Sequence, residues 1–208
     1  MKNLKQMLIE NDKFIKENIN ILSNFEYMYA IKQDKIDVKI YWLKKSADRD
    51  NLNAILDLAK HYYDTFQYDE SFEWYSKGAT LNNNICQYNL SNMFKNGQGI
   101  EQDDELYLFW LKKSADNNYE QALTEMGDIY YDGFYIDKDL KKALKCYKKA
   151  ADKNYLPACL NLSIMYFEGQ GTKKDLNNGY NYLSIAYNSS YQPAIGVFEK
   201  YKNQILIV

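Results

Sequence analysis

Hydrophobic residues recur along this chain at spacings of four and four. A small residue comes first, a large apolar residue follows, and an aromatic residue completes the set, as in Ala122, Met126 and Tyr130. Such spacing places the three side chains on one face of an α-helix. The pattern therefore predicts a series of amphipathic helices. The other sets are Ala54, Leu58 and Tyr62; Cys86, Leu90 and Phe94; and Ala158, Leu162 and Tyr166.

A second sequence phrase follows these helices, and its copies are 36 residues apart except for a spacing of 32 between Trp42 and Trp74. The segment from Trp110 to Ala115 returns 36 residues later, beginning at Cys146, and further copies begin at Trp42 and Trp74. All three tryptophans of the chain thus occupy one repeat position. A period of this length is typical of stacked helical repeats. Each repeat is predicted to contain two helices, with the tryptophan column on the second.

Glycine and aspartate mark the predicted boundaries between the two helices of a repeat. A glycine follows the aromatic column, where a left-handed residue ends a helix. An aspartate then precedes the second helix, where its carboxylate can cap exposed N–H groups. The unit at about 53–84 lacks the glycines and is four residues shorter, so its turn at 64–68 is predicted to be of another type. The glycines are Gly97, Gly133 and Gly169, and the aspartates are Asp103, Asp139 and Asp175.

The repeats are predicted to form a single domain with atypical ends. Residues 1–37 are expected to form an N-terminal cap helix and a degenerate first helix, and residues 38–191 the repeats. Residues 192–208 are expected to form a C-terminal capping helix, from about Pro193 to Ile205, and a tail. Terminal units that depart from the repeat pattern are typical of such arrays, because each unit buries its apolar face against its neighbours.

Composition narrows the function classes. With 46% apolar and 26% charged residues, the 208-residue chain is predicted to be globular. Its net charge of −2 gives no overall attraction to nucleic acid or anionic lipid. The sequence shows no signal peptide, no membrane-length apolar run and no C-x-x-C pair among its three cysteines. We therefore expect a reduced, cytoplasmic protein with no membrane partner, although export by other routes stays open.

Lysine pairs recur on the predicted second helices, at 44–45, 112–113 and 148–149. Stacked repeats would align them into a basic stripe, which a nucleic acid could contact through its phosphates. Acidic residues interleave with the lysines, and these positions are also the solvated sides of amphipathic helices. A solvated surface is the favoured interpretation, and nucleic acid is a disfavoured partner.

The sequence predicts no catalytic, cofactor or metal site. Its one histidine, His61, excludes chemistry built on paired imidazoles within one chain. Asp57, Lys60 and Asp64 lie nearby at helical spacing, but a solvated helix edge explains this group better than a metal site. Phosphate-binding and zinc-protease motifs are absent from the sequence.

The repeat phrase resembles that of the Sel1-like repeat family, whose members are α-solenoids related to tetratricopeptide repeats. The clearest matches run from Ala122 to Gly133 and from Ala158 to Gly171, and the resemblance covers about residues 38–195. It implies an all-α fold, a right-handed α-α superhelix of helix-turn-helix repeats. The predicted structural core of these repeats is Trp42, Trp74, Trp110, Ala122, Gly127, Tyr130, Gly133, Ala158, Leu162, Tyr166 and Gly169.

The resemblance also implies that the first helices line a concave groove. The residues predicted there change from polar and aromatic to apolar along the chain, which suits capture of a peptide. Whether the C-terminal helix covers the apolar end is left open. The predicted groove residues are Leu56, Lys60, Tyr63, Tyr88, Asn92, Lys95, Thr124, Asp128, Tyr131, Leu160, Ile164 and Phe167.

These features predict a non-enzymatic scaffold or adaptor that binds a protein or peptide in that groove. One alternative is a hydrolase acting on cell-wall or β-lactam-like substrates, an activity to which members of the resembling family have been linked. The other is a self-associating structural protein, in which the face with Leu160, Ile164 and Phe167, or the tail at 205–208, pairs with a second copy.

Overall fold

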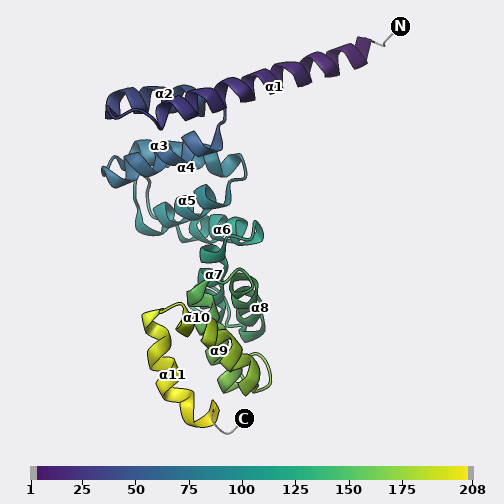
Figure 1. The fold of residues 1–208 in the computed structure, drawn as a ribbon, viewed down its shortest axis with the longest axis vertical. Coiled ribbons are helices and arrows are strands. Elements are labelled where there is room, and N and C mark those ends of the chain that lie inside the picture. Colours follow the sequence, from purple (N-terminus) through teal and green to yellow (C-terminus); the bar gives the residue numbers. More distant parts are fainter. Residues whose placement is uncertain (1–3, 206–208) are drawn as a thin grey trace. The chain divides into compact units, whose positions relative to one another are not determined.

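The computed structural model describes the backbone of residues 4–205 and the side chains of residues 13–204, and within this range every regular element is an α-helix (Figure 1). The all-α helical repeat fold predicted from the sequence is confirmed. The described helices fall into two compact units that divide between Tyr107 and Leu108. The helices are α1 (Leu4–Ala30), α2 (Ile36–Asp48), α3 (Leu52–Asp64), α4 (Tyr68–Thr80), α5 (Asn84–Asn96), α6 (Asp104–Asp116), α7 (Glu120–Asp132), α8 (Leu140–Ala151), α9 (Leu156–Glu168), α10 (Leu176–Asn188) and α11 (Gln192–Ile205).

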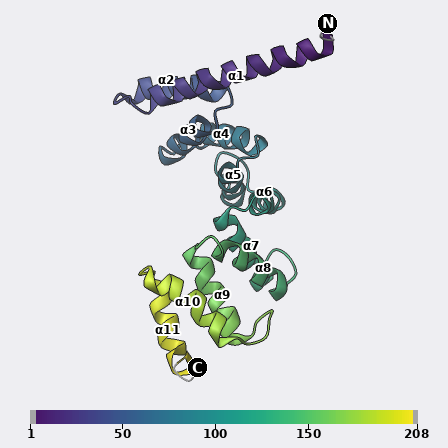
Figure 2. The same cartoon turned by 45° about the vertical axis from the view of Figure 1, so that its right-hand side comes forward.

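Within each unit, helices pack mainly against their neighbours in the sequence (Figures 1 and 2). In the first unit α1 packs on α2 and α3 on α4, and the pairs join through α2–α3 and α4–α5 contacts. In the second unit α7 packs on α8 and α9 on α10, with α8–α9 contacts between the pairs and α11 against α10 and α9. This nearest-neighbour packing is typical of repeat proteins.

The glycine turns form as predicted. Gly97, Gly133 and Gly169 follow α5, α7 and α9 with φ of 66°, 76° and 71°, so the helices end in the left-handed conformation that glycine adopts at least cost. Gly99 and Gly171 also have positive φ, and a Cβ at either would lie 2.3 Å from a backbone carbonyl oxygen of the preceding helix pair. Glycine is therefore required there for two separate reasons.

The predicted aspartate caps are confirmed. The Oδ1 of Asp103 accepts a hydrogen bond from Leu106 N at 2.8 Å. Asp139 and Asp175 accept equivalent bonds, both 3.0 Å long, from Lys142 N and Asn178 N. Each carboxylate thus satisfies an N–H group that has no partner within its own helix.

The short unit turns differently, as its missing glycines predict. Thr65 ends α3, and Phe66 takes the left-handed conformation with φ of 61°. A left-handed residue also connects most second helices to the next first helix. Asparagine and aspartate tolerate this conformation better than other non-glycine residues. These residues are Asp50, Asn82, Asn118, Asn154 and Ser190.

The core confirms the small-residue column and corrects the tryptophan column. Ala122, Ala158 and Leu162 are buried, whereas Trp42, Trp74 and Trp110 are only half-buried. Tyr130 and Tyr166 are half-buried too. The buried column lies one residue after the tryptophans, about 100° further around the helix. Its members are Leu43, Tyr75, Leu111, Tyr147 and Leu183.

The N-terminal region also differs from the prediction. A cap helix and a separate degenerate helix were expected within residues 1–37, but α1 is one continuous helix of 27 residues. At the other end, α11 begins one residue before the predicted start, and the predicted tail at 206–208 lies outside the described residues. Across the described part of the chain, no helix combines the length and the hydropathy needed to span a membrane.

Candidate functional site

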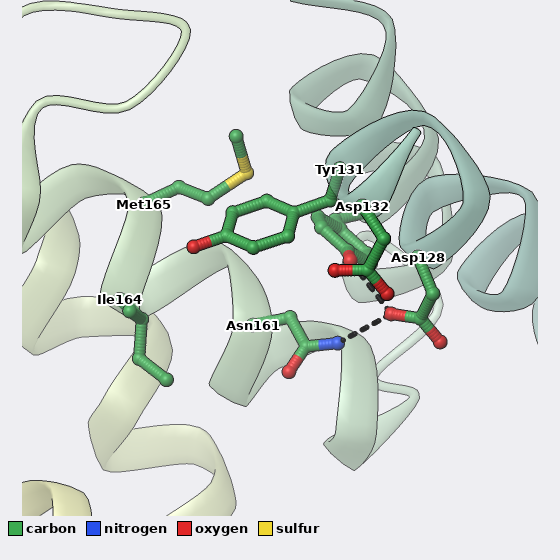
Figure 3. Close-up of a pocket in the computed structure, with 7 residues that line it drawn as sticks. Asp128, Tyr131, Asp132, Asn161, Ile164 and Met165 are labelled. Carbon is green, nitrogen blue, oxygen red and sulfur yellow. Dashed lines mark hydrogen bonds between the residues drawn. The ribbon is translucent and has the colours of Figure 1, made fainter. Parts of the chain in front are cut away.

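A pocket of about 220 Å³ opens on the second unit, between α7, α8 and α9 (Figure 3). The first helices α7 and α9 supply most of its lining, and the second helix α8 supplies one tyrosine. The lining combines two carboxylates, two phenols, an amide and two apolar side chains. These are Asp128, Asp132, Tyr131, Tyr147, Asn161, Ile164 and Met165.

Hydrogen bonds fix the carboxylate of Asp128 at the base of this pocket. Tyr147 donates its hydroxyl to Asp128 Oδ1 at 2.6 Å, and Asn161 donates its amide to the same oxygen at 3.1 Å. Burial, reinforced by the Asp128 carboxylate, raises the pKa of Tyr147 well above its ordinary value. The phenol therefore stays protonated and keeps its role as donor.

Tyr131 and Asp132 complete the α7 side of the pocket. Tyr131 is half-buried and its ring extends from α7 toward Ile164 and Met165 on α9 (Figure 3). Lys138 lies 5.1 Å from the centroid of that ring. Asp132 is exposed at the rim. A ligand would therefore meet an aromatic ring, an isoleucine and two carboxylates within one pocket.

The first unit contains a pocket of about 400 Å³ at the equivalent place, between α3, α4 and α5. Here Lys60 stands on the first helix and Tyr63 donates its hydroxyl to Gln98 Oε1 at 3.1 Å. The Tyr63 ring also packs edge-on against Tyr68, with centroids 5.4 Å apart. The lining residues are Leu56, Lys60, Tyr63, Asp64, Tyr75, Ile85 and Asn89.

The two pockets share a frame of four positions in the repeat register, and each position holds the same residue type in both. Each has a tyrosine and an aspartate at the end of its first helix, a tyrosine on its second helix and an asparagine on the next first helix. The charge differs at the position of Lys60, where the second unit has Asp128, and the apolar part of the lining differs as well. One frame thus carries a cation in one pocket and an anion in the other. The matching pairs are Tyr63 and Tyr131, Asp64 and Asp132, Tyr75 and Tyr147, and Asn89 and Asn161.

Half of the residues predicted for the groove line these pockets. They are Leu56, Lys60 and Tyr63 in the first unit, and Asp128, Tyr131 and Ile164 in the second.

The other predicted groove residues lie elsewhere. Tyr88, Asn92 and Lys95 are half-buried on α5 and line neither pocket. Thr124 is buried, and its hydroxyl donates to Glu120 O at 2.8 Å. Leu160 is buried as well.

The apolar end predicted for the groove is covered by α11. Phe167 is only 1% exposed and stacks on Tyr201, with ring centroids 4.4 Å apart. Tyr201 also donates its hydroxyl to Glu168 Oε1 at 2.5 Å, and Lys200 forms an ion pair with the same oxygen at 3.0 Å. Phe167 is therefore a core residue of the second unit, because the C-terminal helix packs over it.

Sequence reasoning missed the second-helix tyrosines and the asparagines of the shared frame. Tyr75 and Tyr147 fall in the column after the tryptophans and were not among the predicted groove residues. Asn89 and Asn161 stand three residues after the small-residue column and 72 residues apart, which is two repeats of 36. That spacing was a usable signal, because an asparagine beside the core column recurs at the same register.

A third pocket, of about 230 Å³, lies between α6, α7 and α8 in the second unit. Four lysines surround a floor that includes Leu123, Met126 and Tyr130, and Asp116 stands among them. Lys142 lies 5.3 Å from the centroid of the Tyr130 ring. The predicted alignment of lysines thus occurs locally, on the second helices of this unit. The lysines are Lys112, Lys142, Lys145 and Lys149.

The described side chains form no cluster suited to a metal ion. Within residues 13–204, no three histidine, cysteine or carboxylate side chains stand where they could hold a metal ion. The thiols at positions 86, 146 and 159 are unpaired, and burial raises the pKa of Cys86 to about 12. His61 lies edge-on to Tyr62, with ring centroids 5.5 Å apart. What the pockets offer is recognition through hydrogen bonds, charge and apolar contact.

Comparison with known proteins identifies the repeat. The model of the Sel1 repeat family matches residues 40–51, 54–83, 84–119, 120–155 and 156–191. These segments include most of the chain and coincide with the helix pairs. No curated protein matches the chain. Proteins built from Sel1 repeats are typically non-enzymatic scaffolds for protein interaction.

Solved structures share the fold. One is c5321, a protective antigen present in uropathogenic Escherichia coli strains and displaying an SLR fold, at 21% identity and a TM-score of 0.73. That match covers 93% of this chain and 42% of the antigen, so the chain spans less than half of the antigen's length.

A Sel1 repeat protein from Oxalobacter formigenes is 25% identical with a TM-score of 0.59, covering 61% of this chain and 95% of that one. Helicobacter pylori cysteine rich protein B is 24% identical with a TM-score of 0.50, covering 63% and 94%. The register of the helix pairs, the glycine turns and the family match lead to one conclusion: this chain belongs to the Sel1 repeat family.

Proposed function

We propose that this chain is a non-enzymatic scaffold that binds a protein partner through peptide segments, each of which occupies one of the two equivalent pockets. The observation that carries the proposal is their shared frame. Tyrosine, aspartate, tyrosine and asparagine recur at the same repeat positions, while the charge beside them changes from Lys60 to Asp128. A frame that recurs two repeats apart, with a different charge beside it in each pocket, supports recognition of different ligand side chains at the two pockets.

The pocket of the second unit favours a basic ligand side chain. Asp128 and Asp132 supply two carboxylates, which form charge-assisted hydrogen bonds with lysine or arginine. Tyr147 and Asn161 already hold Asp128 in place, so little ordering is needed on binding. Tyr131 and Ile164 supply contact area for the aliphatic part of the same side chain or for an apolar neighbour.

The proposal is tested by selecting ligands from a random peptide library displayed on phage, with the full chain immobilised. Selected peptides are then made synthetically and titrated by calorimetry. We expect them to carry lysine or arginine next to an apolar residue. Replacing Tyr131→Ala should weaken binding at least about 30-fold, as for an aromatic anchor at an interface.

The matched control is Tyr180→Ala. Tyr180 is a 44% exposed tyrosine on α10 of the same unit and lines none of the three pockets described above. This variant should bind the selected peptide as the wild-type chain does. Equal affinity in the Tyr131 and Tyr180 variants would overturn the assignment of the pocket. The alternative function, a hydrolase, would be supported if the purified chain hydrolysed a cell-wall or β-lactam substrate and one point substitution abolished that activity.

A further inference from the structure

Helix α1 carries an unusual concentration of exposed apolar side chains. Between residues 14 and 29, eight large hydrophobic residues are 42–74% exposed. Single exposed apolar residues are normal on a protein surface, but a contiguous set on one element marks an interaction site. The residues are Phe14, Ile15, Ile19, Ile21, Leu22, Phe25, Met28 and Tyr29.

The helix uses a different face to pack within its own unit. Ser23, Glu26 and Ala30 are its buried residues among positions 13–30. Ser46 on α2 donates its hydroxyl to Ser23 O at 2.6 Å, and Arg49 pairs with Glu26 at 3.2 Å. At 100° per residue, the centre of the exposed apolar set lies about 160° around the helix from the centre of this buried face. The set consists of Phe14, Ile21, Phe25 and Met28. Docking on α2 therefore leaves them uncovered.

The N-terminal part of α1 extends past the helices of its unit. Every side chain from residue 13 to residue 22 is exposed. Both ribbon views show this part of α1 running beyond the end of α2 (Figures 1 and 2). An isolated amphipathic helix gains most of its stability from packing its apolar face. The geometry therefore requires a helix-sized partner for this face.

The spacing of the exposed residues indicates what that partner is. Phe14, Asn18, Ile21, Phe25 and Met28 follow one another at intervals of four, three, four and three. This is the heptad pattern of a coiled coil, with Phe14, Ile21 and Met28 at d positions and Asn18 and Phe25 at a positions. In the sequence the same spacing continues back to Asn11, Met7 and Leu4, so a second asparagine falls at an a position.

Asn18 selects the orientation of the pair. In a parallel, in-register dimer the a positions meet, so the two copies of Asn18 face each other and can exchange a hydrogen bond. In an antiparallel dimer Asn18 would face an apolar d residue. Asn18 donates one amide hydrogen to Phe14 O at 2.8 Å, which leaves its carbonyl oxygen available for a partner. Asparagine at a positions specifies register in this way.

We infer that α1 is a dimerisation helix, which forms a parallel two-stranded coiled coil with α1 of a second copy of this chain through Phe14, Asn18, Ile21, Phe25 and Met28. A lipid surface is the competing occupant for an amphipathic helix. Membrane-surface helices are rich in lysine and arginine, whereas residues 13–30 carry two lysines and two glutamates. The balance of charge therefore favours a protein partner. The inference is independent of the proposed peptide pockets.

The oligomeric state of the full chain tests the inference. Light scattering coupled to size exclusion should give twice the chain mass at micromolar concentration. Ile21→Glu should weaken dimerisation at least about 30-fold, because it places a carboxylate at a core d position. The neighbouring control Asn20→Glu, on another face of the same helix, should leave the dimer intact. Circular dichroism should show that the repeats stay folded in both variants, with any loss of helix signal in Ile21→Glu limited to the unpaired part of α1.

Cross-linking tests the orientation. Asn18→Cys should form a disulfide between the two copies when a copper–phenanthroline oxidant is added, because parallel pairing brings the two thiols together. The wild-type chain, with its three native cysteines, and Lys13→Cys are the controls and should cross-link far more slowly. A monomeric wild-type chain, or binding of the chain to phosphatidylserine vesicles through Ile21, would overturn the inference. A dimer in which Asn18→Cys does not cross-link would overturn the parallel arrangement.

Discussion

Single glycines set the turns of this fold for distinguishable physical reasons. Gly97 has positive φ but open space around it, since a Cβ there would meet no atom closer than 3.5 Å. Gly99 combines positive φ with a backbone oxygen, that of Tyr68, only 2.3 Å from the added carbon. Gly196 lies inside α11 with no atom within 4 Å. Gly97 therefore reports the cost of a left-handed backbone alone, and Gly99 reports that cost together with steric overlap. Gly196 reports helix propensity.

Substituting alanine at these positions should give a graded series in stability. Gly196→Ala should stabilise by about 0.5–1 kcal/mol through helix propensity. Gly97→Ala should cost about 1–2 kcal/mol from the left-handed backbone. Gly99→Ala should cost more than either, at least about 2–3 kcal/mol, because overlap with a backbone oxygen adds to the strain.

Urea unfolding followed by circular dichroism measures this series. Tryptophan fluorescence adds a report on the first unit, which holds Trp42 and Trp74 together with Gly97 and Gly99. A loss at Gly97 as large as that at Gly99 would contradict the role given to close backbone approach.

The capping aspartates should contribute to the acid sensitivity of the fold. The hydrogen bond from the Lys142 backbone lowers the pKa of Asp139 below 3.8, and the bond from the Asn178 backbone does the same for Asp175. The folded state thus favours the ionised carboxylates. Their stabilisation is present above the unfolded pKa of about 3.9 and is lost as the pH falls through the lower, folded pKa.

The variant Asp139→Asn with Asp175→Asn isolates this effect. Asparagine keeps a capping oxygen but does not titrate, so the urea midpoint at pH 6 should change little. Between pH 4 and pH 2.5 the variant should lose less stability than the wild-type chain. Asp152→Asn, at an exposed position just after α8, is the control and should follow the wild type. An unchanged acid slope in the double variant would contradict the role of the caps.

At the scale of elements, α11 closes one end of the second unit. Phe167 stacks on Tyr201 of this helix, and Gly179 on α10 lets the Phe167 ring approach closely, because a Cβ there would lie 2.6 Å from it. The hydrogen bonds from Tyr201 and Lys200 lower the pKa of Glu168, so this carboxylate favours the docked helix. An aromatic stack and a charged pair therefore hold α11 in place.

Tyr201→Ala should release this helix. Removing a buried aromatic ring costs about 3–5 kcal/mol, and the loss should be confined to the second unit. Hydrogen exchange should increase across α11 and around Phe167, while the first unit exchanges as before. Ile195→Ala, at a 44% exposed position on the same helix, is the matched control and should change little. Uniform faster exchange over both units would contradict local docking.

The sequence predicted the helix pairs because their determinants are local. Apolar spacing, terminal glycines and capping aspartates act within a few residues, and the structure places Gly97, Gly133, Gly169, Asp139 and Asp175 where these rules predict. Packing between helices was harder to predict. The tryptophan column is half-buried, whereas the column one residue later is buried. The sequence pattern did not show that Leu111, and not Trp110, is the buried residue of this pair.

The candidate site was predicted in part for the same reason. Tyr63 and Tyr131 follow from counting along one helix, whereas Asn89 and Asn161 belong to the next first helix and join the pocket through tertiary packing. Burial of Phe167 could not be predicted from its own helix, because α11, more than 20 residues later, covers it. The spacing of residues within one helix does not indicate which other helix packs against each of its faces.

At the scale of the whole molecule, this chain combines two kinds of surface. The equivalent pockets carry a constant polar frame and one variable charge, which suits recognition of a partner peptide. Helix α1 presents a heptad stripe, which suits pairing with a second copy. A dimeric scaffold would present each pocket twice and gain avidity toward a partner with repeated motifs. If both proposals hold, Tyr131→Ala should remove peptide binding and leave the dimer intact, and Ile21→Glu should do the reverse.

The measurement that tests the central claim most directly is hydrogen–deuterium exchange of the full chain, with and without a peptide selected from the library. Binding at the equivalent pockets predicts slower exchange in residues 124–132 and 158–165, and in residues 56–64 and 85–92 if the peptide reaches the first unit. The side of the second unit that carries Lys112 and Lys149 should remain unchanged. Protection confined to that basic side, or to α1, would contradict the assignment of the peptide site.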